Sequence, residues 1–280
     1  MTHTPPRRYV VVLVLALVAV LVGLAGPWAY ASFVDTSAKD RIEADPPPAL
    51  FPDRTVAPLQ QDVTAQEPRA HALMRTWWRE HGRDEHDAAF VGWLGRTLPG
   101  PPSSTHRTAE VAQVQRLAGI RTASGVRAST WLEAYGKKDL WKLYAHDQAE
   151  MVGSDRGDHR KEALKDMLTM AKDVADSLAL RYEQPAPYVL HPSLRPEKAV
   201  TKGQTCPCSY PSRHAARGAA ATTFLSGLDP HRSQQYHWTE AEIDYSRVYM
   251  AGHVPSDITG GALLGDLIGE YFLVTRHDSA

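Results

Sequence analysis

Cysteine is scarce in this sequence, with only Cys206 and Cys208 in 280 residues, and this scarcity excludes two ways of stabilising a fold. Two thiols are too few for the usual four-ligand zinc site, and they cannot build a framework of several disulfides. A Cys-x-Cys bridge closes a tight ring, and Pro207 restricts it further, so we expect two thiols or a strained bridge. The fold must therefore be stabilised by its hydrophobic core.

An excess of either charge is also absent, since 31 Lys and Arg stand against 32 Asp and Glu, for a formal net charge of −1. Proteins that bind nucleic acids usually present a basic surface to the phosphates. We therefore expect no nucleic-acid partner. With 43% hydrophobic and 22% charged residues, the chain is too apolar to be disordered and can bury a core.

A long apolar run is present near the N-terminus. Residues 9–25 are almost wholly Val, Leu and Ala, and Arg7 and Arg8 precede them. At 1.5 Å per residue the run spans about 26 Å, close to the hydrocarbon thickness of a bilayer. The sequence therefore predicts that residues 1–34 are a membrane anchor or a signal peptide, and that the membrane is a partner through this segment.

Features of the same segment bear on whether it is retained. Ala29-Tyr30-Ala31 before Ser32 fits the small-x-small cleavage pattern of secretory signals, but the run exceeds their usual apolar length of roughly 7–15 residues. Length favours a retained anchor. Because positive residues tend to stay in the cytoplasm, we expect a single-pass protein of the cell membrane with its C-terminal domain exported, or a secreted protein if the signal is cleaved.

The rest of the chain divides by composition. Residues 35–68 hold six prolines and few periodic apolar positions, so they are predicted to form a Pro-rich linker. From residue 69 to residue 280, apolar residues recur with helical spacing, most clearly over residues 160–181, and no strand alternation intervenes. We expect an all-α fold, a helical bundle formed by residues 69–280.

Two polar stretches lie at predicted helix ends. In the first, residues 209–214, Ser212 and the backbone N–H groups after it begin a helix, where unpaired donors and the helix dipole favour an anion. In the second, residues 246–257, Asp257 lies near His253 across a turn. A carboxylate there can accept from one ring nitrogen and leave the other free to attack. Arg247 adds a planar cation suited to phosphate oxygens.

Pro-Ser-x-His followed by Ser-Arg-x5-His-x3-Asp resembles the second and third motifs of the type 2 phosphatidic acid phosphatase superfamily. That superfamily includes bacterial class A acid phosphatases and vanadium haloperoxidases. The resemblance covers about the last 75 residues, and the two motifs in order are far more specific than either alone. It implies metal-independent hydrolysis of a phosphorylated small molecule or a lipid phosphate through a phosphohistidine, with no cofactor.

The resemblance also implies roles for individual residues. His253 would be the nucleophile, Asp257 would orient it, and His214 would act first as general acid and then as general base. The phosphoryl oxygens would be held by Arg247, Ser212 and the backbone around Arg213.

The sequence departs from the family pattern in two places. Arg213 stands where the family usually has Gly, whose missing Cβ lets the backbone approach the phosphate. The first motif, Lys-x6-Arg-Pro, is absent as such, and Lys172, Arg181 and Arg195 are candidate substitutes. Helical-wheel geometry favours Arg181 over Lys172, although either could equally be a solvated flank residue.

Two alternative functions fit the same motifs. One is a vanadium haloperoxidase, with vanadate as the cofactor on the ring nitrogen of His253. The short chain and the depleted first-motif cations argue against it. The other is a non-catalytic family member that binds an anionic ligand or a partner, and the absent first motif is its best support.

Overall fold

The computed structural model describes residues 38–198 and 207–276, and in these ranges the regular structure is helical, with no strand. The all-α prediction is confirmed. The predicted membrane anchor, residues 1–34, lies outside the described residues. The chain divides into two compact units, one ending at Asp45 and one beginning at Pro46, and the second contains every element discussed below.

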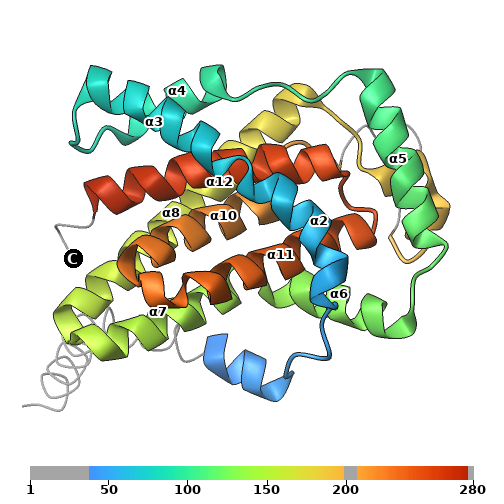
Figure 1. Cartoon of the computed structure of the whole chain (residues 1–280), viewed down its shortest axis with the longest axis horizontal. Coiled ribbons are helices and arrows are strands. Elements are labelled where there is room, and N and C mark those ends of the chain that lie inside the picture. Colours follow the sequence, from blue (N-terminus) through green and yellow to red (C-terminus); the bar gives the residue numbers. More distant parts are fainter. Residues whose placement is uncertain (1–37, 199–206, 277–280) are drawn as a thin grey trace, which may run out of the picture. The chain divides into compact units, whose positions relative to one another are not determined.

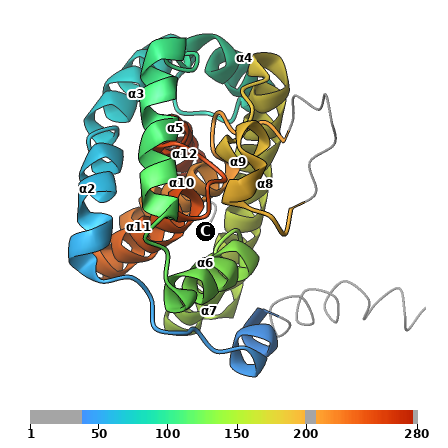
Figure 2. The same ribbon diagram turned by 90° about the vertical axis from the view of Figure 1, so that its right-hand side faces the viewer.

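The second unit is a bundle of helices, most of which follow one another through short connections (Figures 1 and 2). Helices α10 and α12 pack against each other at its centre and contact most of the remaining long helices. The elements are α2 (Asp53–Thr64), α3 (Glu67–His81), α4 (Asp87–Thr97), α5 (Ser104–Ala118), α6 (Ala123–Tyr135), α7 (Asp139–Val152), α8 (Ser154–Tyr182), α9 (Pro187–Leu190), η1 (Pro192–Leu194), α10 (Arg213–Leu228), η2 (Pro230–Arg232), α11 (Ser233–Tyr249) and α12 (Pro255–Thr275).

A row of glycines lets α12 approach α10 closely. Gly261, Gly265 and Gly269 recur every fourth residue, so they share one face of α12. A Cβ on Gly265 would lie 2.4 Å from the carbonyl oxygen of Ala216, and one on Gly261 would lie 2.4 Å from that of Ser212. Larger side chains at these positions would force the two helices apart. This contact fixes the N-terminal ends of α10 and α12, where the two motifs lie.

Helix α12 is by length and composition a candidate membrane span, the one found among the described residues. However, 72% of its most apolar stretch is buried within the protein. Burial against α10 and the surrounding helices accounts for its hydrophobicity, since a core helix is apolar on all faces. We therefore describe α12 as the central core helix.

The segment 35–68, expected to be a Pro-rich linker, contains a packed helix instead. Val56, Leu59 and Val63 lie on one face of α2 and are buried. The prolines permit this because Pro52 precedes the first helical residue, and only Pro58 lies inside the helix. From Asp53 onward the segment belongs to the bundle.

Buried carboxyl groups form a second notable feature of the core. Burial raises the pKa of Asp266 in α12 to about 8, although Thr223 donates a hydrogen bond of 2.9 Å to it. Burial, together with neighbouring carboxylates, also raises the pKa values of Glu240 and Asp244 in α11 well above their usual range. These groups are therefore protonated in the folded protein at mildly acidic pH.

The raised pKa values make stability depend on pH. Between pH 5 and 8 an unfolded carboxyl is ionised while a folded Asp266 keeps its proton. For each such group, the free energy of unfolding therefore falls by about 1.4 kcal/mol for every unit that the pH rises. We expect the melting temperature to fall as pH rises from 5 to 8, and Asp266→Asn to weaken that dependence. Calorimetry of both proteins measures it. Asp173→Asn, at an exposed carboxylate, is the control, and an unchanged slope in Asp266→Asn would contradict the expectation.

Candidate active site

Ser212 joins the N-terminal ends of the two central helices. It is the N-cap of α10, and its hydroxyl accepts a hydrogen bond of 3.3 Å from the backbone N–H of Ala215. Its own N–H donates to the carbonyl oxygen of Asp257 at 2.8 Å. The predicted helix start is thus confirmed. Ser212 is fully buried and its hydroxyl serves the cap, so the structure does not place it on the pocket wall described below.

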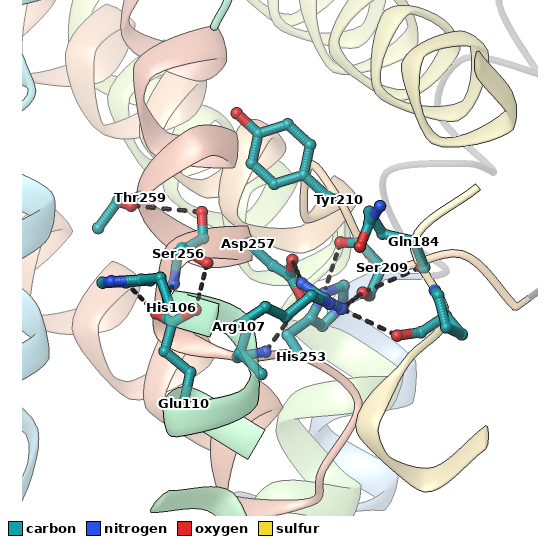
Figure 3. Close-up of polar contacts among 12 residues, drawn as sticks. His106, Arg107, Glu110, Gln184, Ser209, Tyr210, His253, Ser256, Asp257 and Thr259 are labelled. Atoms are coloured by element: carbon teal, nitrogen blue, oxygen red, sulfur yellow. Dashed lines mark hydrogen bonds and ion pairs between the residues drawn. The ribbon is translucent and has the colours of Figure 1, made fainter. Parts of the chain in front are cut away.

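His253 lies in the turn between α11 and α12, where Ala251 has a left-handed φ of 56°. Its Nδ1 is 2.9 Å from the carbonyl oxygen of Ser209 and 3.8 Å from Oδ2 of Asp257 (Figure 3). A carbonyl oxygen can only accept, so Nδ1 carries the proton and Nε2 keeps its lone pair. This tautomer leaves Nε2 available as a nucleophile.

Burial lowers the pKa of His253 below its ordinary value, and the opposing effect of Asp257 is too small to restore it. The imidazole is therefore neutral at neutral pH. Burial alone would raise the pKa of Asp257, but His253 and Arg107 together lower it, so this carboxyl is ionised. The site thus pairs a neutral histidine with a buried carboxylate.

His214 lies in the first turn of α10 and is buried. It hydrogen-bonds to the backbone of Glu133, and its Nε2 has no hydrogen-bond partner among the described residues. Burial lowers the pKa of His214 well below its ordinary value, and the positive charge of Arg247 adds to this. A buried imidazole next to a cation accepts a proton readily only when an anion lies nearby to balance the charges. His214 is therefore expected to take up a proton when an anionic ligand is bound.

Both histidines line one cavity of about 300 Å³. Four cationic side chains also line it: Arg195, Lys198, Arg213 and Arg247. Its other lining residues include Glu133, Asp176, Tyr188, Pro211 and Gly252. The cavity is therefore a polar pocket with a positive wall and two histidines in its lining.

Glu133 in α6 organises the cations of this pocket. Its carboxylate lies 3.3 Å from Nη1 of Arg247, 3.1 Å from Nη2 of Arg195 and 3.5 Å from Nζ of Lys198. Burial would raise the pKa of Glu133, but Arg247 and Arg195 lower it to about 2. Arg247 is buried, and its Nε has no hydrogen-bond partner in the described part of the chain.

The candidate first-motif substitutes separate into two groups. Arg195 lines the pocket, because residues 183–198 turn back toward the site and Tyr188 N–H bonds the carbonyl oxygen of Ala251 at 3.2 Å. Lys172 and Arg181 do not line it. Lys172 pairs with Asp173 at 2.8 Å, and the exposed Arg181 donates to the carbonyl oxygen of Gly95 at 2.8 Å. The helical-wheel preference for Arg181 thus finds no support in the geometry.

Arg213 occupies the position where the family usually has Gly. It lies on the pocket wall with its side chain 43% exposed and its Nη1 3.3 Å from Oδ1 of Asp176. Asp176 also lies 3.2 Å from Nζ of Lys172. The extra side chain therefore adds a cation to the pocket mouth, where Asp176 holds it.

Sequence reasoning missed several residues at this site. Glu133 and Lys198 carry no local signal, because their partners are distant in the sequence. Arg107 in α5 does carry one, since it lies one turn from Glu110 on the same face as the buried Val111 and Val114. Charged residues on an apolar helix face indicate buried polar contacts.

Of the two cysteines in the sequence, Cys208 lines the pocket and is disulfide-bonded. Cys206 lies outside the described residues.

Comparison with known proteins bears on the same region. Residues 167–279 match the model of the PAP2 superfamily. No curated protein matches the chain at a significant level. The matched residues include both motifs and both pocket histidines, and the motif resemblance is thereby confirmed. Residues 167–279 are therefore similar to the PAP2 superfamily.

Proposed function

We propose that the protein hydrolyses phosphate monoesters through a phosphohistidine on His253. The observation that supports this most directly is the shared pocket, where His253 and His214 both meet a wall of cations. His253 presents a lone pair on Nε2 because its Nδ1–H is bound to the Ser209 carbonyl oxygen. The match to the PAP2 superfamily supports a phosphatase or a related activity in general.

The charge of the pocket suits a phosphoryl group. Its four cationic side chains face two carboxylates, Glu133 and Asp176, which leaves positive charge in excess. A phosphate monoester carries up to two negative charges near neutral pH. Phosphoryl transfer needs mainly positioning and charge stabilisation, and fixed cations in a partly buried pocket provide both.

In the first step, Nε2 of His253 attacks phosphorus while the bond from phosphorus to the ester oxygen breaks. His214 gives its proton to that oxygen, and the alcohol leaves. In the second step, His214 takes a proton from water, whose oxygen attacks phosphorus as the bond to His253 breaks. Inorganic phosphate is released together with the proton that His214 took from water, and both imidazoles are left neutral.

His214 is neutral before the ester binds, because its pKa lies well below the ordinary value. It therefore needs a proton donor before it can act as a general acid. The phosphate ester supplies it: the monoanion carries one proton, with a second pKa of about 6. A bound anion also offsets the cations that disfavour imidazolium. Activity should therefore fall as pH rises above about 6, where the monoanion is lost.

Lipid phosphates and soluble esters present the same phosphoryl group, so the function test uses both. The purified full-length protein is assayed with an aryl phosphate, an alkyl phosphate and a lipid phosphate in vesicles, each with and without EDTA. We expect at least one ester to be hydrolysed equally in EDTA, with inhibition by vanadate, a phosphate look-alike that would bind the same cations.

The same assay distinguishes the alternative functions. Bromide oxidation by peroxide, appearing only when vanadate is added, would favour a haloperoxidase. Phosphate or vanadate binding without hydrolysis of any ester would favour a non-catalytic anion-binding protein. Hydrolysis that EDTA abolishes would contradict the phosphohistidine route.

A further inference from the structure

Arg107 approaches the site from α5, a helix that lies outside the PAP2 match. It is 6% exposed, and its guanidinium donates to three acceptors (Figure 3). Nη1 lies 2.8 Å from Oδ1 of Asp257, while Nη2 lies 2.7 Å from Oγ of Ser209 and 2.8 Å from the carbonyl oxygen of Pro185. The guanidinium therefore joins three segments of the chain next to His253.

Two of these acceptors belong to the residues that face Nδ1 of His253. Ser209 offers its carbonyl oxygen to Nδ1 at 2.9 Å, and Arg107 holds the hydroxyl of the same residue. Asp257 already receives Arg107 on Oδ1 and the N–H of Val254, at 3.0 Å, on Oδ2. With both oxygens engaged, the carboxylate stays 3.8 Å from Nδ1, beyond hydrogen-bond range.

We propose that Arg107 is a positioning residue for His253, which keeps the imidazole neutral by balancing the charge of Asp257 and keeps Nδ1–H directed at the Ser209 carbonyl. This inference rests on the proposed function, in which Nε2 of His253 is the attacking atom. Arg107 itself touches neither the pocket nor the reacting atoms.

A neighbouring contact of α5 separates this role from ordinary docking of the helix. Glu110, one turn after Arg107, accepts hydrogen bonds from the N–H and the hydroxyl of Ser256 at 2.8 and 2.6 Å. It fastens α5 to the first turn of α12 without touching either partner of Nδ1. Glu110→Gln is therefore the matched control for a purely structural effect.

The charges around His253 set the direction of the expected shift. The titratable and charged groups that influence His253, directly or through a neighbouring group, come from four helices. They are Asp257 on α12, Arg247 on α11, His214 and Arg213 on α10, and Arg107 on α5. Removing the cation of Arg107 leaves the Asp257 carboxylate unbalanced, which favours the imidazolium. The pKa of His253 should then rise by about one unit.

The test measures the imidazole directly. NMR titration of the full-length protein, with His253 assigned from its absence in His253→Ala, gives the His253 pKa in the parent, Arg107→Gln, Arg107→Lys and Glu110→Gln. We expect Arg107→Gln to raise this pKa by about one unit, to move the acid limb of kcat/KM equally, and to lower kcat about 100-fold with KM nearly unchanged. Arg107→Lys should keep the parental pKa, because it keeps the charge. Glu110→Gln should lower the melting temperature without moving the pKa.

Each outcome decides something. A folded Arg107→Gln with the parental His253 pKa overturns the inference. If that variant does not fold, Arg107→Lys decides: parental kcat overturns the positioning role, whereas lower kcat at the parental pKa supports it, since a lysine cannot form the same fork. If the parent hydrolyses no ester, the proposed function fails, and the titration still shows whether Arg107 controls the charge of His253.

Discussion

His253→Ala should lose turnover by roughly 10³- to 10⁶-fold and form no phosphorylated enzyme, because removing a nucleophile removes the first step of the reaction. His214, the other pocket histidine, has no partner for its Nε2 among the described residues, hydrogen-bonds to the backbone of Glu133, and is assigned the proton transfers. Rapid-quench trapping of acid-labile phosphohistidine measures the effect. His191→Ala, at an exposed histidine outside the pocket, is the matched control and should trap phosphate as the parent does.

The opposite pattern of trapping would reverse the assignment of the two histidines. Phosphate that persists on the His253 variant and disappears from the His214 variant would make His214 the nucleophile. The tautomer fixed by the Ser209 carbonyl oxygen argues against that outcome, since it leaves the lone pair of His253 on Nε2, the ring nitrogen that can enter the pocket.

His214→Ala should slow hydrolysis to a degree that depends on the leaving group. General acid catalysis contributes about 10²- to 10⁴-fold, so an alkyl phosphate should lose roughly that much in the phosphorylation step. An aryl phosphate should lose clearly less, because its leaving oxygen needs less protonation. Single-turnover rates with both esters, compared with the parent, measure the difference.

The pH profile supplies an independent check on His214. In the parent, the rate with the alkyl ester should fall above about pH 6 as the ester loses its proton. In His214→Ala, the aryl ester should lose this dependence. Equal rate losses with both esters would show that His214 holds the phosphoryl group rather than transferring a proton.

Local signals in the sequence were enough to predict the helical class and the motif positions. Capping chemistry placed Ser212 at a helix start, and apolar spacing predicted the core helices. The spacing between His253 and Asp257 correctly predicted proximity across a turn, but the structure puts them 3.8 Å apart with the Ser209 carbonyl closer. The sequence could not show this, because Ser209 is 44 residues away.

Contacts between distant segments account for what the sequence did not predict. Arg195 reaches the pocket only because residues 183–198 fold back, and helical-wheel arguments do not apply to a segment that leaves the helix. The helix α2 was hidden by prolines, which suggest a linker even though Val56, Leu59 and Val63 repeat with helical spacing. In both cases contacts with distant parts of the chain determined the structure, and the local composition alone suggested a different one.

The positions of Arg107 and Glu133 bear on how the candidate site is distributed along the chain. The PAP2 match begins at residue 167, yet the cation that balances Asp257 comes from residue 107, and the carboxylate that gathers Arg195 and Arg247 comes from residue 133. Residues 167–279 by themselves would leave the buried Arg247 without the carboxylate of Glu133 and the buried Asp257 without the guanidinium of Arg107. The segment that matches the family is thus shorter than the part of the chain that forms the site. A graft of this segment into another protein would have to include α5 and α6.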